Sequence, residues 1–205
     1  FSKTNARILH LGYLMLLDRM DTFENGQTIA AKLLFNARSA GLETSVDMCS
    51  ASHPQFREIA LSALPLTDHL VINEIEAGLS LGEIIDPKNA GWLLRSAEQL
   101  LSLGVKKTVT IHTEHGAVCA TAEGLRLKQP SLKLPVGYSK GATGAGDAFA
   151  AGMLYGLHEG LGIQERLRLA VCCAAACLQD PTPSKGLRPV KDCLALADQF
   201  GFGEF

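Results

Sequence analysis

The sequence predicts an α/β protein built on a largely parallel sheet that helices cover on both faces. Apolar runs typical of buried strands alternate along the chain with stretches whose apolar residues have helical spacing. Glycines and prolines mark the ends of these stretches, and no repeat or low-complexity segment interrupts them. This order favours parallel strands, because a parallel neighbour needs a crossover connection, usually a helix.

Strand and helix alternate through the first part of the chain. Strands are expected at residues 8–11, 44–48 and 69–73. A helix is expected at residues 28–40, since Ile29, Leu33 and Ala37 recur every four residues and Gly41 follows as a stop signal. Pro54 is suited to the opening of a second helix.

The second part of the chain continues this pattern and adds a hairpin. Asp86 and Pro87 resemble a cap and a first-turn proline, which predicts a helix that begins there and ends at Gly104. A strand is expected at residues 109–112, short β pieces at 116–122 and 125–134, and helices at 147–158, 164–178 and 191–200. Gly152 and Gly156, one turn apart, would let their helix approach a neighbour closely.

Composition limits the class of protein. The 205 residues are 47% hydrophobic and 20% charged, and they can form one substantial core, so a single domain over residues 1–205 is expected. The net charge of −2 provides no basic field for nucleic acid or an anionic membrane. Without a long apolar run or a recognisable signal peptide, a cytoplasmic location is predicted.

Six cysteines occur, and their spacing predicts neither a zinc site nor a disulfide framework. Cys172, Cys173 and Cys177 lie among alanines, where thiols behave as small core side chains.

The most informative stretch is residues 141–152, where four glycines and one carboxylate stand at the start of an apolar helix. Gly141, Gly144 and Gly146 can adopt positive-φ or crowded conformations, and the first amides of the helix have no helical acceptor. A phosphate would fit there, and the carboxylate of Asp147 suggests proton abstraction. In the alternative reading, the glycines only form a strand-to-helix turn and Asp147 caps the helix.

Two better-known phosphate loops do not fit these residues. A P-loop requires Lys and then Ser or Thr after its last glycine, but Asp147 and Ala148 follow Gly146. A dinucleotide fingerprint requires a third glycine where Phe149 stands. The segment instead resembles the C-terminal signature of the PfkB or ribokinase family of carbohydrate and nucleoside kinases, over about a dozen residues.

A second motif agrees with this resemblance. Asn73-Glu74-Ile75-Glu76 follows an apolar run that resembles a parallel strand, and ligands of open α/β sheets bind at that edge. Asn73 and Glu76 occupy the two fixed positions of the family's Asn-x-x-Glu motif, which implies that they organise Mg²⁺ and phosphate through water. By themselves, these residues equally suit a helix cap and an acidic first turn.

The resemblance implies a three-layer, ribokinase-like α/β/α fold with a mostly parallel central sheet, and an ATP-dependent phosphotransferase. Asp147 would be the general base toward a hydroxyl of a sugar or sugar-like substrate, and the amides of Gly144, Ala145 and Gly146 would form the anion hole. Mg²⁺ would arrive with ATP. Asp47, at the end of a predicted strand, would support phosphate or Mg²⁺, or would cap the following loop.

Nucleotide contacts are expected on both sides of the glycine loop. The candidate residues come from the predicted strand end near residue 113, from the glycine loop and from the turn after residue 178: Thr113, Gly116, Gly141, Thr143, Ser184 and Gly186. His112 or His115 could contact nucleotide, or could be solvated turn residues. Tyr13 would border the substrate pocket or serve packing.

The chain departs from the family pattern in two respects. Many relatives have an aspartate six residues before the catalytic one, in a monovalent-cation site; Gly141 stands there, which puts potassium activation in doubt. The chain also opens near the strand that normally lies midway. We therefore expect a fragment without the N-terminal strands, the lid and most of the sugar-binding residues.

Several alternatives stay open at this point. The chain could be a nucleotide-binding module without turnover, a structural domain that holds no phosphate, or a kinase of the hydroxymethylpyrimidine and pyridoxal group. The expected partners are a small sugar or nucleoside and, as an open alternative, a second copy of the chain. Neither nucleic acid nor a membrane is expected.

Overall fold

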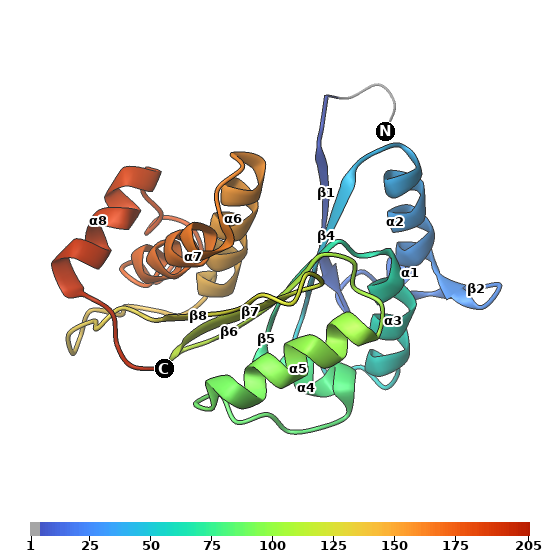
Figure 1. Cartoon of the computed structure of the whole chain (residues 1–205), viewed down its shortest axis with the longest axis horizontal. Coiled ribbons are helices and arrows are strands. Elements are labelled where there is room, and N and C mark those ends of the chain that lie inside the picture. The colour runs from blue at the N-terminus through green and yellow to red at the C-terminus, as the bar shows by residue number, and fades with distance from the viewer. Residues whose placement is uncertain (1–4) are drawn as a thin grey trace. The chain divides into compact units, whose positions relative to one another are not determined.

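The computed structural model describes residues 5–205. Within these residues, six strands form one sheet in the order β1-β4-β5-β6-β7-β8, and two more form a small hairpin, β2-β3. Strand β1 pairs with β4, and β4 with β5, in parallel register. The predicted three-layer α/β fold with a mostly parallel central sheet is thus confirmed (Figure 1).

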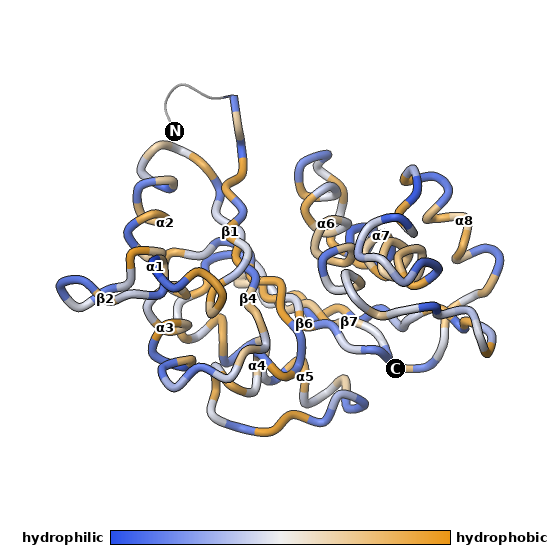
Figure 2. The backbone as a smooth tube through the Cα atoms, turned by 180° about the vertical axis from the view of Figure 1, so that it is seen from behind, coloured by the Kyte–Doolittle hydropathy of each residue, from blue (hydrophilic) through white to orange (hydrophobic). Residues whose placement is uncertain are grey.

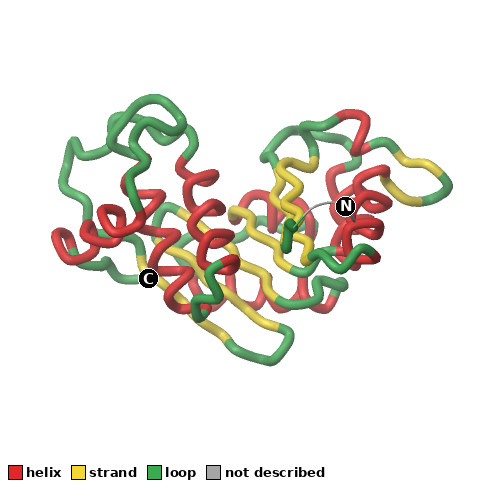
Figure 3. Tube along the Cα trace, turned by 90° about the horizontal axis from the view of Figure 1, so that it is seen from above, coloured by secondary structure: helices red, strands yellow, loops and turns green. Residues whose placement is uncertain are grey.

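The chain packs as two compact units, each of which is described by itself. The first unit takes nearly all of residues 5–111: β1 (Ile8–Leu14), α1 (Asp18–Asp21), β2 (Phe23–Glu24), β3 (Gln27–Thr28), α2 (Ile29–Ser39), β4 (Glu43–Met48), α3 (Phe56–Ala63), the 3₁₀ helix η1 (Leu64–Leu66), β5 (His69–Asn73), α4 (Glu74–Leu81) and α5 (Ala90–Ser102). Strands β6 (Thr108–Thr113), β7 (Gly116–Thr121) and β8 (Arg126–Pro130) contribute residues to both units. The second unit contains α6 (Ala145–His158), α7 (Ile163–Cys177) and α8 (Val190–Phe200). The sequence of helix, strand and loop can be followed in Figure 3.

The core of the first unit lies where α2 and α3 pack near the strands. Leu34, Val46, Ile59, Leu70 and Ile72 have no exposed surface. Burying an aliphatic side chain of this size contributes about 1.5–3 kcal/mol, and this burial holds the parallel strands in register. The carboxyl ends of β4 and β5 are thereby fixed next to each other.

Helix boundaries follow the local sequence signals in most places. Thr28 caps α2, because its Oγ1 accepts the N–H of Ala31 at 3.1 Å, and Gly41 after the helix has a φ of 86°. Asp86 and Pro87 do not begin a helix, so that prediction is wrong. Helix α5 begins at Ala90, and the two residues lie in the preceding loop.

The β2-β3 hairpin was not expected from the sequence. Its turn is Asn25-Gly26, and both residues have positive φ, 52° and 82°, as a two-residue type I′ hairpin requires. The tip of the hairpin is hydrophilic (Figure 2). Because each strand has two residues, the segment lacks the alternating apolar pattern by which strands are usually recognised.

Two glycines bring α6 and α7 of the second unit into close contact, as predicted. A Cβ at Gly152 would lie 2.7 Å from the Cα of Ala170, and one at Gly156 would lie 2.8 Å from the Cγ of Arg166. Cys172 and Cys177 are buried free thiols in α7, and burial raises the pKa of Cys172 to about 11. The thiols therefore serve as small core side chains, as expected.

In residues 5–205, no helix is both long enough and apolar enough to cross a membrane.

Candidate functional site

The glycine turn lies at the start of α6. At one of its positions, the backbone has a conformation that only glycine adopts without strain. Gly144 is the N-cap with a φ of 83°, and a Cβ there would lie 2.2 Å from the carbonyl oxygen of Pro183. At Gly141, a Cβ would lie 2.9 Å from the Cα of Pro181. The loop that contains these prolines thus packs directly on the turn, and the predicted positive-φ or crowded conformation is confirmed for both glycines.

Gly146 does not share this requirement. It is the second residue of α6, and a Cβ there would meet Cε1 of His112 at 3.5 Å, an ordinary van der Waals distance. The prediction of a positive or crowded conformation at Gly146 is therefore wrong. The small size of the residue instead leaves the first turn of the helix open next to its amide group.

The amides of this turn define where an anion could bind. The N–H of Ala145 already donates to the carbonyl oxygen of Ala142 at 3.1 Å, which closes the turn. The amide of Gly146 belongs to the first turn of a 14-residue helix, and N–H groups of a first turn generally have no acceptor within the helix. The positive end of the helix dipole lies at the same place, so the turn favours a negatively charged group.

Asp147 is the third residue of α6, and its side chain is exposed. A carboxylate at this position is itself stabilised by the helix dipole. Its negative charge also acts on His112 of β6: burial lowers the pKa of His112 to about 4, and the charge of Asp147 partly opposes this change. His112 is therefore a neutral imidazole near pH 7.

The ring of His112 stacks on Phe149 of α6. The ring centroids are 4.8 Å apart, and the planes are inclined by 36°. The reading of His112 as a solvated turn residue is thus wrong, because the residue belongs to β6 and its ring is half-buried. His115 lies in the turn between β6 and β7.

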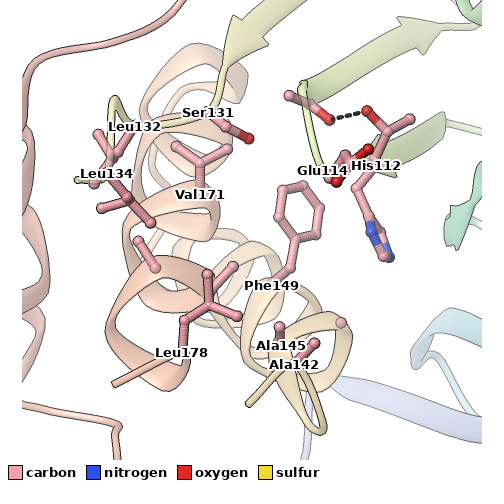
Figure 4. Close-up of a pocket in the computed structure, with 15 residues that line it drawn as sticks. His112, Glu114, Ser131, Leu132, Leu134, Ala142, Ala145, Phe149, Val171 and Leu178 are labelled. Atoms are coloured by element: carbon pink, nitrogen blue, oxygen red, sulfur yellow. Dashed lines mark hydrogen bonds between the residues drawn. The ribbon is translucent and has the colours of Figure 1, made fainter. Parts of the chain in front are cut away.

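A cavity of about 290 Å³ lies in the second unit beside the glycine turn. Its volume is near the lower end of the range of about 300–1,000 Å³ that is usual for small-molecule sites. The walls are mainly apolar (Figure 4), and the lining comes from β6, β7, the segment after β8, α6 and α7: His112, Thr113, Glu114, Gly116, Ser131, Leu132, Leu134, Ala142, Ala145, Gly146, Phe149, Val171, Ala174, Ala175 and Leu178. The cavity therefore offers space beside the glycine turn for a ligand with an apolar part.

Two of the predicted nucleotide-contacting residues, Thr113 and Gly116, line this cavity. The other four are not among its described lining residues: Gly141, Thr143, Ser184 and Gly186. Gly186 serves close packing, since a Cβ there would lie 2.5 Å from the carbonyl oxygen of Cys177. The carbonyl oxygen of Thr143 lies 3.8 Å from the Sγ of Cys177 in α7.

In the first unit, Asn73 and Glu76 form a reciprocal pair at the start of α4. Asn73 Oδ1 accepts the N–H of Glu76, and Glu76 Oε2 accepts the N–H of Asn73, both at 2.9 Å. This is a capping box, so the capping role that the sequence left open is confirmed. Burial of Glu76, which is 4% exposed, raises the pKa of its carboxyl group, and its hydrogen bonds oppose that shift.

Ser50 completes this cluster and was missed in the sequence. Its Oγ donates to Glu76 Oε1 at 2.7 Å and lies 2.9 Å from Nδ2 of Asn73, which also donates to Glu76 Oε1. Ser50 follows β4, whereas Asn73 ends β5, so the cluster joins the carboxyl ends of two adjacent parallel strands. Nothing in the local sequence of Ser50 indicates this contact.

In the first unit, the carboxylates of Glu76 and Asp47 suit contact with Mg²⁺ through water rather than direct coordination. A carboxylate offers about four lone-pair positions, and Glu76 already accepts three hydrogen bonds, which leaves room for one water. Asp47 is 6% exposed, and its Oδ1 accepts the N–H of Met48 at 2.7 Å. Among the described residues, no group of three or more His, Cys, Asp or Glu side chains could hold a metal ion.

The structure therefore assembles two groups of candidate residues, one in each unit. Ser50, Asn73 and Glu76 are joined by hydrogen bonds in the first unit. The glycine turn, Asp147 and the cavity are contiguous in the second.

Comparison with known proteins matches residues 8–188 to the model of the pfkB family carbohydrate kinases. Among solved structures, the chain resembles Arabidopsis thaliana ribokinase complexed with ribose and ATP, at 23% identity and a TM-score of 0.66, over 82% of this chain and 51% of that one. It also resembles Escherichia coli phosphofructokinase-2 in complex with substrates and products (20% identity, TM-score 0.65, 84% and 52%). A third is Burkholderia thailandensis nucleoside kinase with inosine (21%, 0.65, 84% and 53%). The chain spans about half the length of these proteins.

Proposed function

Because the chain belongs to the pfkB family of carbohydrate kinases, we propose that its second unit binds ATP and that Asp147 is the general base for phosphoryl transfer to a hydroxyl group. The acceptor would be a sugar or a sugar-like molecule such as a nucleoside. One observation carries the proposal: Asp147 stands in the first turn of α6, directly after the glycine turn that borders the cavity. A base and an anion-binding turn are thus built from consecutive residues.

The reaction follows from the placement of these groups. The carboxylate of Asp147 accepts the proton of the acceptor hydroxyl while the hydroxyl oxygen forms its bond to the γ-phosphorus. The bond between that phosphorus and the β,γ-bridging oxygen breaks, so ADP leaves and the proton stays on Asp147. The amides at Gly144 and Gly146, with the helix dipole, stabilise the charge on the phosphoryl oxygens, and each donor of this kind lowers a barrier by about 3 kcal/mol.

Mg²⁺ would neutralise phosphate charge when it is bound with the nucleotide. In the first unit, Asn73 and Glu76 would contact Mg²⁺ through water, which agrees with the single lone-pair position left on Glu76. Asp47, at the end of β4, would support phosphate or Mg²⁺ from the same edge of the sheet. A monovalent-cation site is not part of the proposal, because Gly141 stands where the family's aspartate would be.

ADP formation tests this proposal. The full chain is incubated with Mg·ATP and, separately, with ribose, fructose and inosine, beside the variants Asp147→Asn and Asp192→Asn. Asp192 is the matched control, because it is an exposed aspartate in the first turn of α8. We expect Asp147→Asn to reduce turnover by about 10²–10⁴-fold, the usual contribution of a general base, and Asp192→Asn to leave it unchanged.

Equal turnover in Asp147→Asn and the wild-type chain would refute the role of Asp147. ATP binding without turnover for any acceptor would instead favour a nucleotide-binding module.

A further inference from the structure

His112 stands beside the proposed anion-binding turn, and the proposed reaction gives it no role. It belongs to β6 and lines the cavity of the second unit. Its ring reaches the start of α6, since a Cβ on Gly146 would lie 3.5 Å from Cε1 and 3.9 Å from Nε2 of the imidazole. The amide of Gly146 is one of the donors assigned to the anion site. The imidazole therefore borders the space that a phosphate bound at this amide would occupy.

Packing, and not hydrogen bonding, holds the ring of His112 in place. The ring lies beside that of Phe149 (Figure 4), with the centroids 4.8 Å apart and the planes inclined by 36°. Within residues 5–205, neither ring nitrogen has a hydrogen-bond partner. A half-buried polar group without a partner lowers stability, so an apolar side chain would serve packing alone better. The unused nitrogens indicate a ligand.

The chemistry of the ring suits an anion. Burial lowers the pKa of His112 to about 4, so the imidazole is neutral near pH 7 and has one N–H donor. Nε2 is the nitrogen nearer to Gly146. The described residues that line the cavity include no lysine or arginine. Within this lining, hydrogen-bond donors would therefore take the place of a cationic side chain.

We propose, on the basis of the proposed nucleotide site, that Nε2 of His112 donates a hydrogen bond to the phosphate that binds at the glycine turn, beside the N–H of Gly146. Such hydrogen bonds span about 2.7–3.2 Å, and the several oxygens of a phosphate group can accept from both donors at once. The neutral ring thus adds a donor to the anion site without adding charge. Loss of one hydrogen bond to a charged group weakens binding by about 10–100-fold.

Two substitutions at position 112 separate this role from packing. His112→Leu removes both ring nitrogens and keeps an apolar side chain against Phe149. His112→Gln keeps a donor, because its amide nitrogen can reach the place of Nε2. If His112 only packed, leucine would replace it better than glutamine. If it donates to phosphate, glutamine is the better replacement.

Calorimetric titration of the full chain with Mg·ATP tests the inference. His158→Leu is the matched control, because it removes an exposed histidine from the last position of the same helix, α6. We expect His112→Leu to bind Mg·ATP about 10–100-fold more weakly than the wild-type chain. His112→Gln should retain most of the affinity, and His158→Leu should retain all of it. Urea unfolding of each variant shows that the titrated protein is folded.

Adenosine, which carries no phosphate, is titrated in parallel. Its affinity should be the same for the wild-type chain and His112→Leu. An equal loss for adenosine and Mg·ATP would place the contact on the nucleoside and overturn the inference.

Two further results would overturn the inference and leave the proposed function intact: wild-type affinity for Mg·ATP in His112→Leu, or equal weakening in His112→Leu and His112→Gln. Failure of the folded wild-type chain to bind Mg·ATP would overturn the proposed function and the inference together.

Discussion

Replacement of Gly144 by alanine tests whether the glycine turn depends on its contact with Pro183. The added Cβ would lie 2.2 Å from the carbonyl oxygen of Pro183, so the two must separate by about 0.8 Å to reach the shortest distance that such atoms tolerate, 3.0 Å. Alanine at a φ of 83° costs about 1–2 kcal/mol by itself. Overpacking adds about 1–3 kcal/mol. We expect the free energy of unfolding to fall by about 2–5 kcal/mol.

Gly137→Ala is the matched control for this experiment. Gly137 has a φ of 79°, and a Cβ there would meet no atom within 4 Å, so only the backbone cost of about 1–2 kcal/mol applies. Urea unfolding followed by circular dichroism measures both variants, and titration with Mg·ATP then reports whether the anion site survives. The same stability loss in Gly144→Ala and Gly137→Ala would show that the contact with Pro183 does not constrain the turn.

The remaining predictions concern buried polar groups. Glu76→Gln should lower the free energy of unfolding by about 1–3 kcal/mol, because every partner of Glu76 donates a hydrogen bond and an amide cannot accept them all. Glu74→Gln, in the same helix turn, should lower the free energy of unfolding by only a few tenths of a kcal/mol, as measured by urea unfolding. Equal losses of stability in Glu74→Gln and Glu76→Gln would contradict the stabilising role of the hydrogen-bonded cluster. Burial lowers the pKa of His112 from 6.5 to about 4, so its contribution to stability is present above pH 6.5 and is lost as the pH falls toward 4, by at most about 3 kcal/mol. In His112→Gln, the free energy of unfolding should change less with pH between 6.5 and 4 than in the wild-type chain. If the free energies of unfolding of the two proteins differ by the same amount at pH 7 and at pH 4, the lowered pKa of His112 is contradicted.

The features that were predicted correctly from the sequence depend on residues that lie close together in the chain. The capping box links Asn73 and Glu76, three residues apart, and the turn at Gly144 needs a conformation that glycine alone adopts readily. The middle of the buried parallel strand β5, Leu70-Val71-Ile72, is apolar, so composition reveals the strand. Such signals are local, and tertiary contacts did not override them.

The features that sequence did not predict come from contacts between distant residues. Ser50 reaches Glu76 across 26 positions, and Pro183 closes on Gly144 from another loop. The ring of His112 is half-buried because Phe149, on a different element, stacks on it. Which serine, proline or histidine acquires such a partner depends on the packing of the whole unit. Local patterns carry no information on this choice.

The ATP site at the start of α6 is the central claim, and a calorimetric titration with Mg·ATP tests it most directly. The wild-type chain and the Asp147→Ala variant are titrated side by side. We predict that both bind ATP, since the proposed anion site consists of backbone amides and the helix dipole and does not include the carboxylate. Absence of binding by the folded wild-type chain would contradict the account.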